Sequence, residues 1–478
     1  MNLRPFCILL ARILQVLVFA ILIGCFAGPG FAQTTASDPI YLPFVLRPES
    51  PPTGPRVNAP YFPNNIVLTE TAIFWMGRVN ANENYADVRV GYNPTELLVH
   101  IAIFDRRVWF DSSPSQIDLT AWDAISLFLD MDGNTSSVID DRSFRFVGQL
   151  RWDGNPQDYQ AVYTGGPTWN LAAIPFTTQA GYVSDNNPAD DTDDRGWVIS
   201  YRIPFSSLGM SGPPAQGSTW GLGVVLHDRD SAAGPPLPDK TWPVALDVLH
   251  PITWGRLYFG LPGYTPPPAT PGGTVNIRHG VDGAVVTDAH VGGHTICGEP
   301  YNPNFFNGWG DANYAGYEQV NVQNQANLGD WPCFSKYYVT FPLNALPAGK
   351  TILSASLTLY QFGNSDPQNA HDSLIQVLTT TDGWNESTIT WNNAPYAWEN
   401  VSRVRVPVLL SYPGLPGVAR EWDVSRAVAE AYRNGIPLRL VLYSADYWMH
   451  SGKYFYSSDM NVYAQTSRPL LTIHWGGP

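Results

Sequence analysis

Carboxylates beside tryptophans give the first chemical signal in this sequence. Residues 381–395 read TDGWNESTITWNNAP, with Glu386 between Trp384 and Trp391 and with Asp382 four residues before Glu386. Sugar rings stack on indole faces, and glycosidases cleave with two carboxyl groups held about 5–9 Å apart. The segment therefore contains the residue types of a glycosidase site.

The same segment also suits a purely structural role. Acidic side chains before a strand commonly accept backbone hydrogen bonds at corners. We expect a short strand over residues 388–391, with Ile389 and Trp391 facing the core and an exit turn over residues 392–395. The chain also lacks a Gly-x-Ser-x-Gly elbow and a His-Glu-x-x-His motif. We therefore predict that Glu386 holds a corner, and that Glu386→Gln weakens folding more than it alters any reaction.

The composition predicts mostly β structure around these residues. The 478 residues include 42 Gly, 42 Pro, 17 Trp and 24 Tyr, and only 14% are charged, which is typical of sandwiches with short strands. The formal net charge of −14 argues against a nucleic-acid partner, because phosphate binding needs basic patches.

Pro-rich stretches divide the chain into two bodies. Residues 33–56 form a predicted tether and residues 261–272 a linker, leaving bodies at residues 57–260 and 273–478 that are each long enough for a core of their own. We expect an all-β monomer of two jelly-roll-like antiparallel β-sandwiches, with one short helix in the second.

The first body resembles carbohydrate-binding module family 9. The resemblance covers about residues 57–260 and rests on the order of several weak motifs. These are ADVRVGY (86–92), WDAISLFLD (122–130), GWVISYRIPF (196–205) and WGLGVVLHDRD (220–230).

This resemblance implies a sandwich that clamps a sugar between tryptophans and uses calcium structurally. By position, Trp122 and Trp242 are the expected clamp, and Asp105 and Asp123 at strand ends are the expected calcium ligands. An indole face offers an apolar surface to sugar C–H groups at little rotamer cost. The alternative is that these tryptophans are core or corner residues.

The second body contains clearer secondary-structure signals. LSASLTLY (353–360) alternates apolar and polar residues and predicts a half-buried strand. Asp423 can cap a helix over residues 424–433, which Asn434 and Gly435 can end.

Over about residues 273–478 the chain resembles the DNRLRE domain, carbohydrate-binding module family 96. The resemblance rests on FPLNALPAGKTI (341–352), the 353–360 strand, WNE with TITWNNAP (384–395), WDVS (422–425) and RPLLTI (468–473), in that order. It implies a jelly-roll sandwich that binds polysaccharide, with acidic polymers such as alginate a known type of ligand.

Three aromatic residues of this body are candidates for sugar stacking. Trp309 lies in an aromatic insertion over residues 296–333, which is either an added ligand loop or a cap over one sandwich face. Tyr447 and Trp448 are adjacent in the sequence. Nearby cationic residues, Arg439 and Lys453, are either partners for uronate carboxylates or part of a solvated strand surface.

The first 32 residues have the features of a secretory signal. Arg4 and Arg12 precede an apolar run that ends in small residues, with cleavage expected after Ala32. A competing interpretation takes Cys25 as a lipidated anchor. No later run reaches the roughly 18 apolar residues of a membrane span.

Only Cys297 and Cys333 remain after such a cleavage. In an oxidising compartment they predict one disulfide across a spacing of 36 residues (333 − 297), worth about 3–4 kcal/mol by chain entropy. Two free buried thiols are the alternative.

Three functions are therefore open. The first is a secreted, non-catalytic protein with two tethered polysaccharide-binding modules. The second is a glycoside hydrolase or polysaccharide lyase acting through the second body. The third is a structural protein of the cell surface or matrix.

Overall fold

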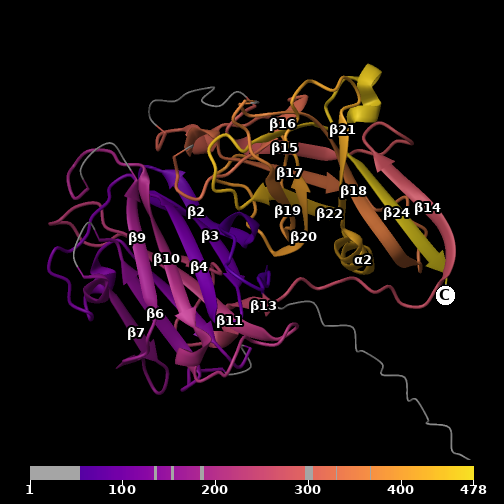
Figure 1. Cartoon of the computed structure of the whole chain (residues 1–478). Helices are drawn as coiled ribbons and strands as arrows, with labels where there is room; N and C mark the ends of the chain where they lie inside the picture. Colours follow the sequence, from indigo (N-terminus) through magenta and orange to yellow (C-terminus); the bar gives the residue numbers. More distant parts are fainter. Residues whose placement is uncertain are drawn as a thin grey trace, which may run out of the picture. The chain divides into compact units, whose positions relative to one another are not determined.

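Three β-sheets make up the fold (Figure 1). The computed structural model describes residues 54–133, 137–151, 155–183, 188–295, 305–329, 331–366 and 368–477. The predicted secretory signal, Cys25, most of the predicted tether and Cys297 lie outside the described residues.

The N-terminal sandwich packs a five-stranded sheet against one part of a 13-stranded sheet. The five-stranded sheet runs in the order β2 (Ala72–Asn80), β3 (Glu83–Tyr92), β4 (Glu96–Phe104), β10 (Gly196–Pro204) and β9 (Thr177–Val183). The facing strands are β1 (Arg56–Ala59), β13 (Gly255–Phe259), β11 (Thr219–His227), β5 (Ala124–Asp130), β6 (Ser143–Gln149), β7 (Gln160–Thr164) and β8 (Asn170–Ala172), with β12 (Lys240–Trp242) paired to β11. Val99, Ile101 and Ile103 of β4 enter the core between the two sheets.

The C-terminal sandwich uses the other part of the 13-stranded sheet. Its strands there are β15 (Thr287–Gly292), β17 (Ser335–Phe341), β22 (Leu438–Ser444), β19 (Ser373–Thr379) and β20 (Glu399–Val406). A six-stranded sheet covers them, formed by β14 (Thr270–Arg278), β24 (Leu470–Gly477), β18 (Thr351–Asn364), β23 (Lys453–Tyr456), β16 (Gln319–Val322) and β21 (Val418–Asp423). Most ladders are antiparallel, as in β10–β4, β11–β5, β18–β24 and β19–β20. The prediction of two β-sandwiches is confirmed.

Helix α2 (Ser425–Arg433) lies where the sequence predicts it. Oδ1 of Asp423 accepts a hydrogen bond from the backbone N–H of Ser425 at 2.9 Å. Gly435 ends the segment with a φ of 65°, which favours glycine. Short 3-10 segments lie in the loops: η1 (Leu68–Glu70), η2 (Leu119–Ala121), η3 (Pro156–Tyr159), η4 (Phe205–Leu208), η5 (Pro251–Thr253), η6 (Trp309–Asp311), η7 (Trp331–Cys333) and η8 (Val462–Ser467).

The expected strand over residues 388–391 is wrong. Turns take its place, because the backbone hydrogen bonds are made locally: the N–H of Ile389 bonds to the carbonyl of Asn385 at 2.9 Å, and the N–H of Thr390 bonds to Oδ1 of Asn393 at 2.8 Å. Ile389 and Trp391 are nevertheless buried, as expected.

A third apolar core joins the two sandwiches, which lie in one compact unit over residues 52–478. The outer face of the five-stranded sheet contributes Trp75, Tyr85 and Phe104, which pack with Trp391 and Tyr443 of the C-terminal half. Strand β4 is therefore buried on both faces, which explains why its polar alternation in the sequence is only partial.

Within this core, four rings surround the ammonium group of Lys336. Its Nζ lies 3.5 Å from the ring centroid of Trp391, 4.3 Å from Trp75, 4.5 Å from Tyr85 and 5.0 Å from Tyr443. We call these four rings the Lys336 cage. A buried ammonium without water around it gains attraction from such electron-rich faces.

Strand β1 closes the seam between the halves. It pairs in parallel with β13 of its own half and meets β20 of the other half at Arg56 and Glu399. Glu399 is buried and accepts hydrogen bonds from Arg56, Asn58 and Arg426. Asn392 adds a pair of hydrogen bonds to the backbone of Val79, at 2.8 and 3.0 Å.

Candidate functional site

Three buried aspartates meet at one end of the N-terminal sandwich. Asp105 follows β4, Asp123 precedes β5 and Asp228 follows β11, so both sheets contribute. Each offers a carboxylate oxygen, and these oxygens lie within 4.8 Å of one another. Sequence reasoning named Asp105 and Asp123 but missed Asp228, whose one signal was its position directly after a strand.

Backbone donors satisfy only part of this acidic trio. Asp123 accepts hydrogen bonds from the backbone N–H groups of Trp109 at 2.6 Å and Arg229 at 2.9 Å. By contrast, Oδ1 of Asp228 is buried and has no hydrogen-bond partner among the described residues. An unsatisfied, buried carboxylate oxygen is costly unless a proton or a cation accompanies it.

Burial and mutual repulsion shift the titration of the trio. Burial raises the pKa of Asp105 and Asp123 well above the usual range, and the neighbouring carboxylates raise it further. Burial, followed by repulsion from Asp230, raises the pKa of Asp228 to about 7. A set made only of oxygen ligands suits a hard cation such as Ca²⁺, which would replace the protons.

The two expected clamp tryptophans do not form an open pair. Trp242 has only 3% of its surface exposed and packs against Phe74, with ring centroids 4.0 Å apart. Trp122 is half-buried, and the guanidinium of Arg229 lies 4.5 Å from its ring centroid. A sugar would have to displace core packing to reach Trp242.

Tyr447 and Trp448 form an exposed aromatic surface directly after β22. They are 43% and 51% exposed, and their rings meet edge to face at 5.3 Å. The imidazole of His371 stacks on Trp448, with centroids 4.9 Å apart. We call these three residues the Trp448 surface. Aromatic rings held open to solvent are what a sugar needs for stacking.

Buried polar groups hold this surface in place. Nζ of Lys453 donates hydrogen bonds to the backbone carbonyls of His371 at 2.6 Å and Ser451 at 2.5 Å. Asp446, directly before Tyr447, accepts hydrogen bonds from Ser373 at 2.6 Å and Ser444 at 2.8 Å. Lys453 is thus buried and paired, and positions a loop instead of facing a uronate.

Trp309 lies inside the third core. It is 6% exposed, its ring lies 5.0 Å from that of Trp391, and its Nε1 donates to the carbonyl of Pro332. The insertion was expected to be either an added ligand loop or a cap over one sandwich face, and the burial of Trp309 is that of a residue in a cap. Cys333 is buried and disulfide-bonded, whereas its expected partner Cys297 lies outside the described residues, so that pairing stays a prediction.

Glu386 lies near two carboxylates other than Asp382, its neighbour in the sequence. Glu386, Asp288 and Asp459 offer oxygens within 4.8 Å of one another. Burial, then repulsion from and hydrogen bonding with Asp459, raises the pKa of Glu386 to about 7. Asp288 is itself held by the hydroxyl of Tyr337 and by Ser458.

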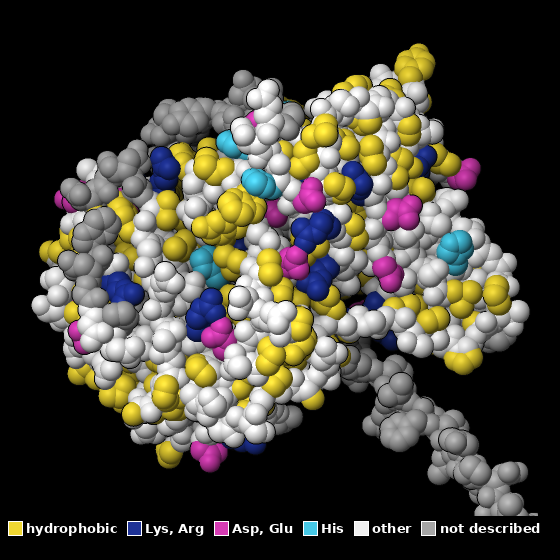
Figure 2. All heavy atoms as spheres, viewed as in Figure 1, with side chains coloured by type: hydrophobic (Ala, Val, Ile, Leu, Met, Phe, Trp, Pro, Cys, Tyr) yellow, Lys and Arg dark blue, Asp and Glu magenta, His cyan; other side chains and the backbone are white. Residues whose placement is uncertain are grey.

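The visible surface carries no extended patch of one charge. On the face drawn in Figure 2, basic and acidic side chains lie among one another, with apolar and uncharged polar surface between them. In the part of the chain that the structure describes, no helix is both long and apolar enough to cross a membrane.

A model of a carbohydrate-binding module family matches part of the C-terminal half. Residues 307–457 match the model of carbohydrate-binding module family 96, which confirms the resemblance seen in the sequence there. This segment includes Trp309, Tyr447 and Trp448.

Solved structures of carbohydrate-binding module family 9 also match. Two from Caldicellulosiruptor kristjanssonii, in complex with cellotriose and with glucose, are each 13% identical with a TM-score of 0.31. The first match covers 43% of this chain and 93% of that chain, and the second covers 44% and 100%. A search of curated proteins found no match.

Proposed function

We propose that this chain is an exported, non-catalytic polysaccharide-binding protein that holds its ligand on the Trp448 surface. The observation that carries the proposal is the exposure of Tyr447 and Trp448 inside the segment that matches family 96, on a loop fixed by Lys453 and Asp446. Tyr317 and Tyr412 of the same segment are also exposed, but Tyr447 and Trp448 are the adjacent exposed pair whose rings contact each other.

Affinity electrophoresis of the full chain in gels containing alginate, xylan or a soluble β-glucan tests the proposal. We expect at least one polymer to retard the protein, and Trp448→Ala to remove most of the retardation. Tyr463→Ala is the matched control, because Tyr463 is an aromatic residue that is 96% exposed in another loop. No retardation of the unaltered chain by any polymer would overturn the proposal.

The N-terminal sandwich, we infer, is stabilised by a calcium ion held by Asp105, Asp123 and Asp228. The fit rests on three buried carboxylates within 4.8 Å and on the unpartnered Oδ1 of Asp228. Calorimetric titration with Ca²⁺ should give a saturable heat that Asp228→Asn removes. An equal heat from the variant would refute this assignment.

Export is proposed from the sequence alone, because residues 1–32 have the composition of a secretory signal. Mass spectrometry of the mature protein distinguishes cleavage before Gln33 from lipidation at Cys25. A lipidated Cys25 would favour a surface-attached protein, with the sandwiches serving as binding or structural modules.

A glycoside hydrolase or polysaccharide lyase is the second candidate, since burial and the neighbouring carboxylate of Asp459 raise the pKa of Glu386 to about 7. The direct hydrogen bond between Glu386 and Asp459 counts against this candidate, because glycosidase carboxyl groups stand apart with the sugar between them. Release of oligosaccharide by the unaltered chain, abolished in Glu386→Gln, would establish the enzyme.

A further inference from the structure

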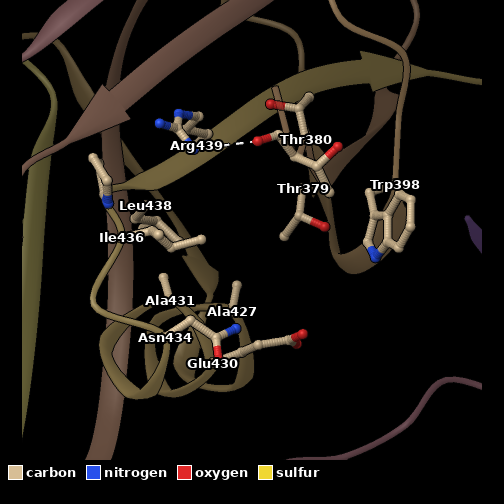
Figure 3. A pocket seen from close by; sticks show the side chains of 12 residues that line it. Thr379, Thr380, Trp398, Ala427, Glu430, Ala431, Asn434, Ile436, Leu438 and Arg439 are labelled. Atoms are coloured by element: carbon tan, nitrogen blue, oxygen red, sulfur yellow. Dashed lines mark hydrogen bonds between the residues drawn. The ribbon is translucent and has the colours of Figure 1, made fainter. Parts of the chain in front are cut away.

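A pocket of about 130 Å³ lies between helix α2 and the ends of strands β19 and β22 (Figure 3). It is separate from the Trp448 surface, since none of Tyr447, Trp448 or His371 lines it. An engineered apolar cavity of about 150 Å³ takes up benzene, so this volume is on the scale of one six-membered ring.

The pocket combines an apolar floor with an aromatic wall. Ala427, Ala431 and Leu438 form the buried floor, while the half-buried ring of Trp398 stands on the other side (Figure 3). Among the described residues, no other aromatic ring contacts Trp398. Its backbone is fixed, because its N–H donates to Thr379 and its carbonyl accepts from Arg56.

Two opposite charges complete the lining. Nη1 of Arg439 donates to the carbonyl of Thr381 at 3.2 Å, and the guanidinium makes no ion pair with a described carboxylate. The carboxylate of Glu430 extends from α2 into the open space below Trp398 (Figure 3). Glu430 makes no ion pair within the described residues either, so both groups are available to a ligand there.

We infer that this pocket binds one neutral pyranose residue of a polysaccharide, as a second subsite distinct from the Trp448 surface. The sugar's C–H face lies on Trp398, and its hydroxyls bond to Glu430 and Arg439. A neutral sugar fits because one carboxylate and one guanidinium leave the lining without net charge, and vicinal hydroxyls can donate to the first and accept from the second. The inference rests on the proposed function.

Saturation-transfer NMR on the full chain tests the inference with methyl glycosides of glucose, galactose, mannose and xylose as probes, and with glucuronate for comparison. We expect at least one neutral glycoside to bind. Glu430→Gln and Arg439→Gln each remove one charged partner of the sugar hydroxyls and should weaken that binding about tenfold, and Trp398→Ala should abolish it. Glu421→Gln, on the exposed face of β21, is the control for Glu430→Gln.

Several outcomes would overturn this inference. They are binding of no neutral glycoside, stronger binding of glucuronate than of any neutral glycoside, and binding that is insensitive to both Glu430→Gln and Arg439→Gln. The two conservative variants keep the test valid if Trp398→Ala fails to fold. Polymer retardation that depends on Trp448 while glycoside binding is absent would reject the pocket and leave the proposed function standing. Absence of all polymer retardation would reject the proposed function.

Discussion

The Lys336 cage and the Trp448 surface use the same residue types for opposite purposes. Tyr443 belongs to the cage and is fully buried, whereas Tyr447, four residues later, is 43% exposed. Strand β22 ends at Ser444 between them. An aromatic residue type therefore does not by itself identify a sugar site. In this segment the ring within the strand is buried, and the ring that follows the end of the strand is exposed.

The difference also lies in what each set of rings contacts. The cage rings surround a cation of the chain itself, and burial lowers the pKa of Lys336 well below its ordinary value of 10.5. Asp87 opposes that shift and also accepts hydrogen bonds from Tyr85 and Tyr443. Within the described residues, the rings of the Trp448 surface contact one another, with His371 and Tyr447 each against Trp448, and Tyr447 and Trp448 stay 43% and 51% exposed.

The largest expected effect breaks the cage. Trp391→Ala removes a buried indole from the third core and should lower the free energy of unfolding by about 3–5 kcal/mol. Trp448→Ala, at an exposed position, should change it by less than about 0.5 kcal/mol. Urea unfolding followed by circular dichroism measures both. Similar losses in the two variants would contradict the division into structural and exposed rings.

The next effect concerns the seam beside the cage. Burial opposes ionisation of Glu399, but Arg56 and Arg426 outweigh it and hold the pKa of Glu399 below 4.5. Glu399→Gln leaves both guanidinium groups without their carboxylate and should cost about 3 kcal/mol at pH 7.

This stabilisation has a defined pH dependence. A lowered pKa of an acid in the folded state stabilises the protein above the unfolded pKa of 4.5, and the stabilisation is lost as the pH falls through the folded value. The stability difference between Glu399→Gln and the unaltered chain should therefore shrink below pH 4.5. Urea midpoints from pH 3.5 to 7 measure it, and a constant difference would disprove the ion pair's contribution.

Calcium should stabilise the N-terminal half without involving either aromatic set. At a concentration 100 times its dissociation constant, the ion should add about 2.7 kcal/mol. Without the ion, the folded protein keeps a proton on Asp228, because burial raises the pKa of this carboxyl to about 7. The stabilisation that comes from binding this proton is lost as the pH rises through about 7. Melting curves with Ca²⁺ or EDTA should therefore differ more at pH 8 than at pH 5.5. Asp228→Asn should show no difference at either pH.

A smaller effect sharpens the ligand side of the comparison. Removing the exposed indole in Trp448→Ala should weaken polymer binding about tenfold, equivalent to about 1.4 kcal/mol. Affinity electrophoresis at graded polymer concentration measures this change. An equal loss in the control Tyr463→Ala would mean that exposed aromatic residues act without regard to position.

The smallest effect is expected at Glu386. The raised pKa of Glu386 means that the folded protein favours the protonated carboxyl. This preference stabilises the folded state fully below pH 4.5, and the stabilisation is lost as the pH rises through about 7. Glutamine resembles that protonated form, so Glu386→Gln should be almost neutral at pH 5 and stabilising at pH 8. This replaces the destabilisation expected from the sequence. A large loss at both values would restore the corner role.

Local patterns in the sequence predicted many individual elements. The alternation in LSASLTLY gave a strand that lies within β18, and the helix predicted over residues 424–433 is α2, which begins one residue later at Ser425. These signals depend on neighbours a few residues apart, which the sequence displays directly.

Tertiary packing decided what the sequence could not show. Trp242 was a clamp candidate by position, but its ring fills the core against Phe74. Asn392 lay in an expected exit turn, yet it bonds to Val79, 313 residues away. The acidic trio needed Asp228 to come from a second strand of the facing sheet. Each of these depends on contacts between distant segments, which no local period reports.

The parallel pairing of β1 gives the molecule a mechanical property. Its four residues, Arg56–Ala59, lie in register with residues 256–259 of β13, and the same strand meets β20 across the seam. A pull on the N-terminal end of β1 would act along these ladders. Load of that kind shears all the paired residues together instead of peeling them one by one. The short first strand therefore passes a force applied at Arg56 to both sandwiches at once.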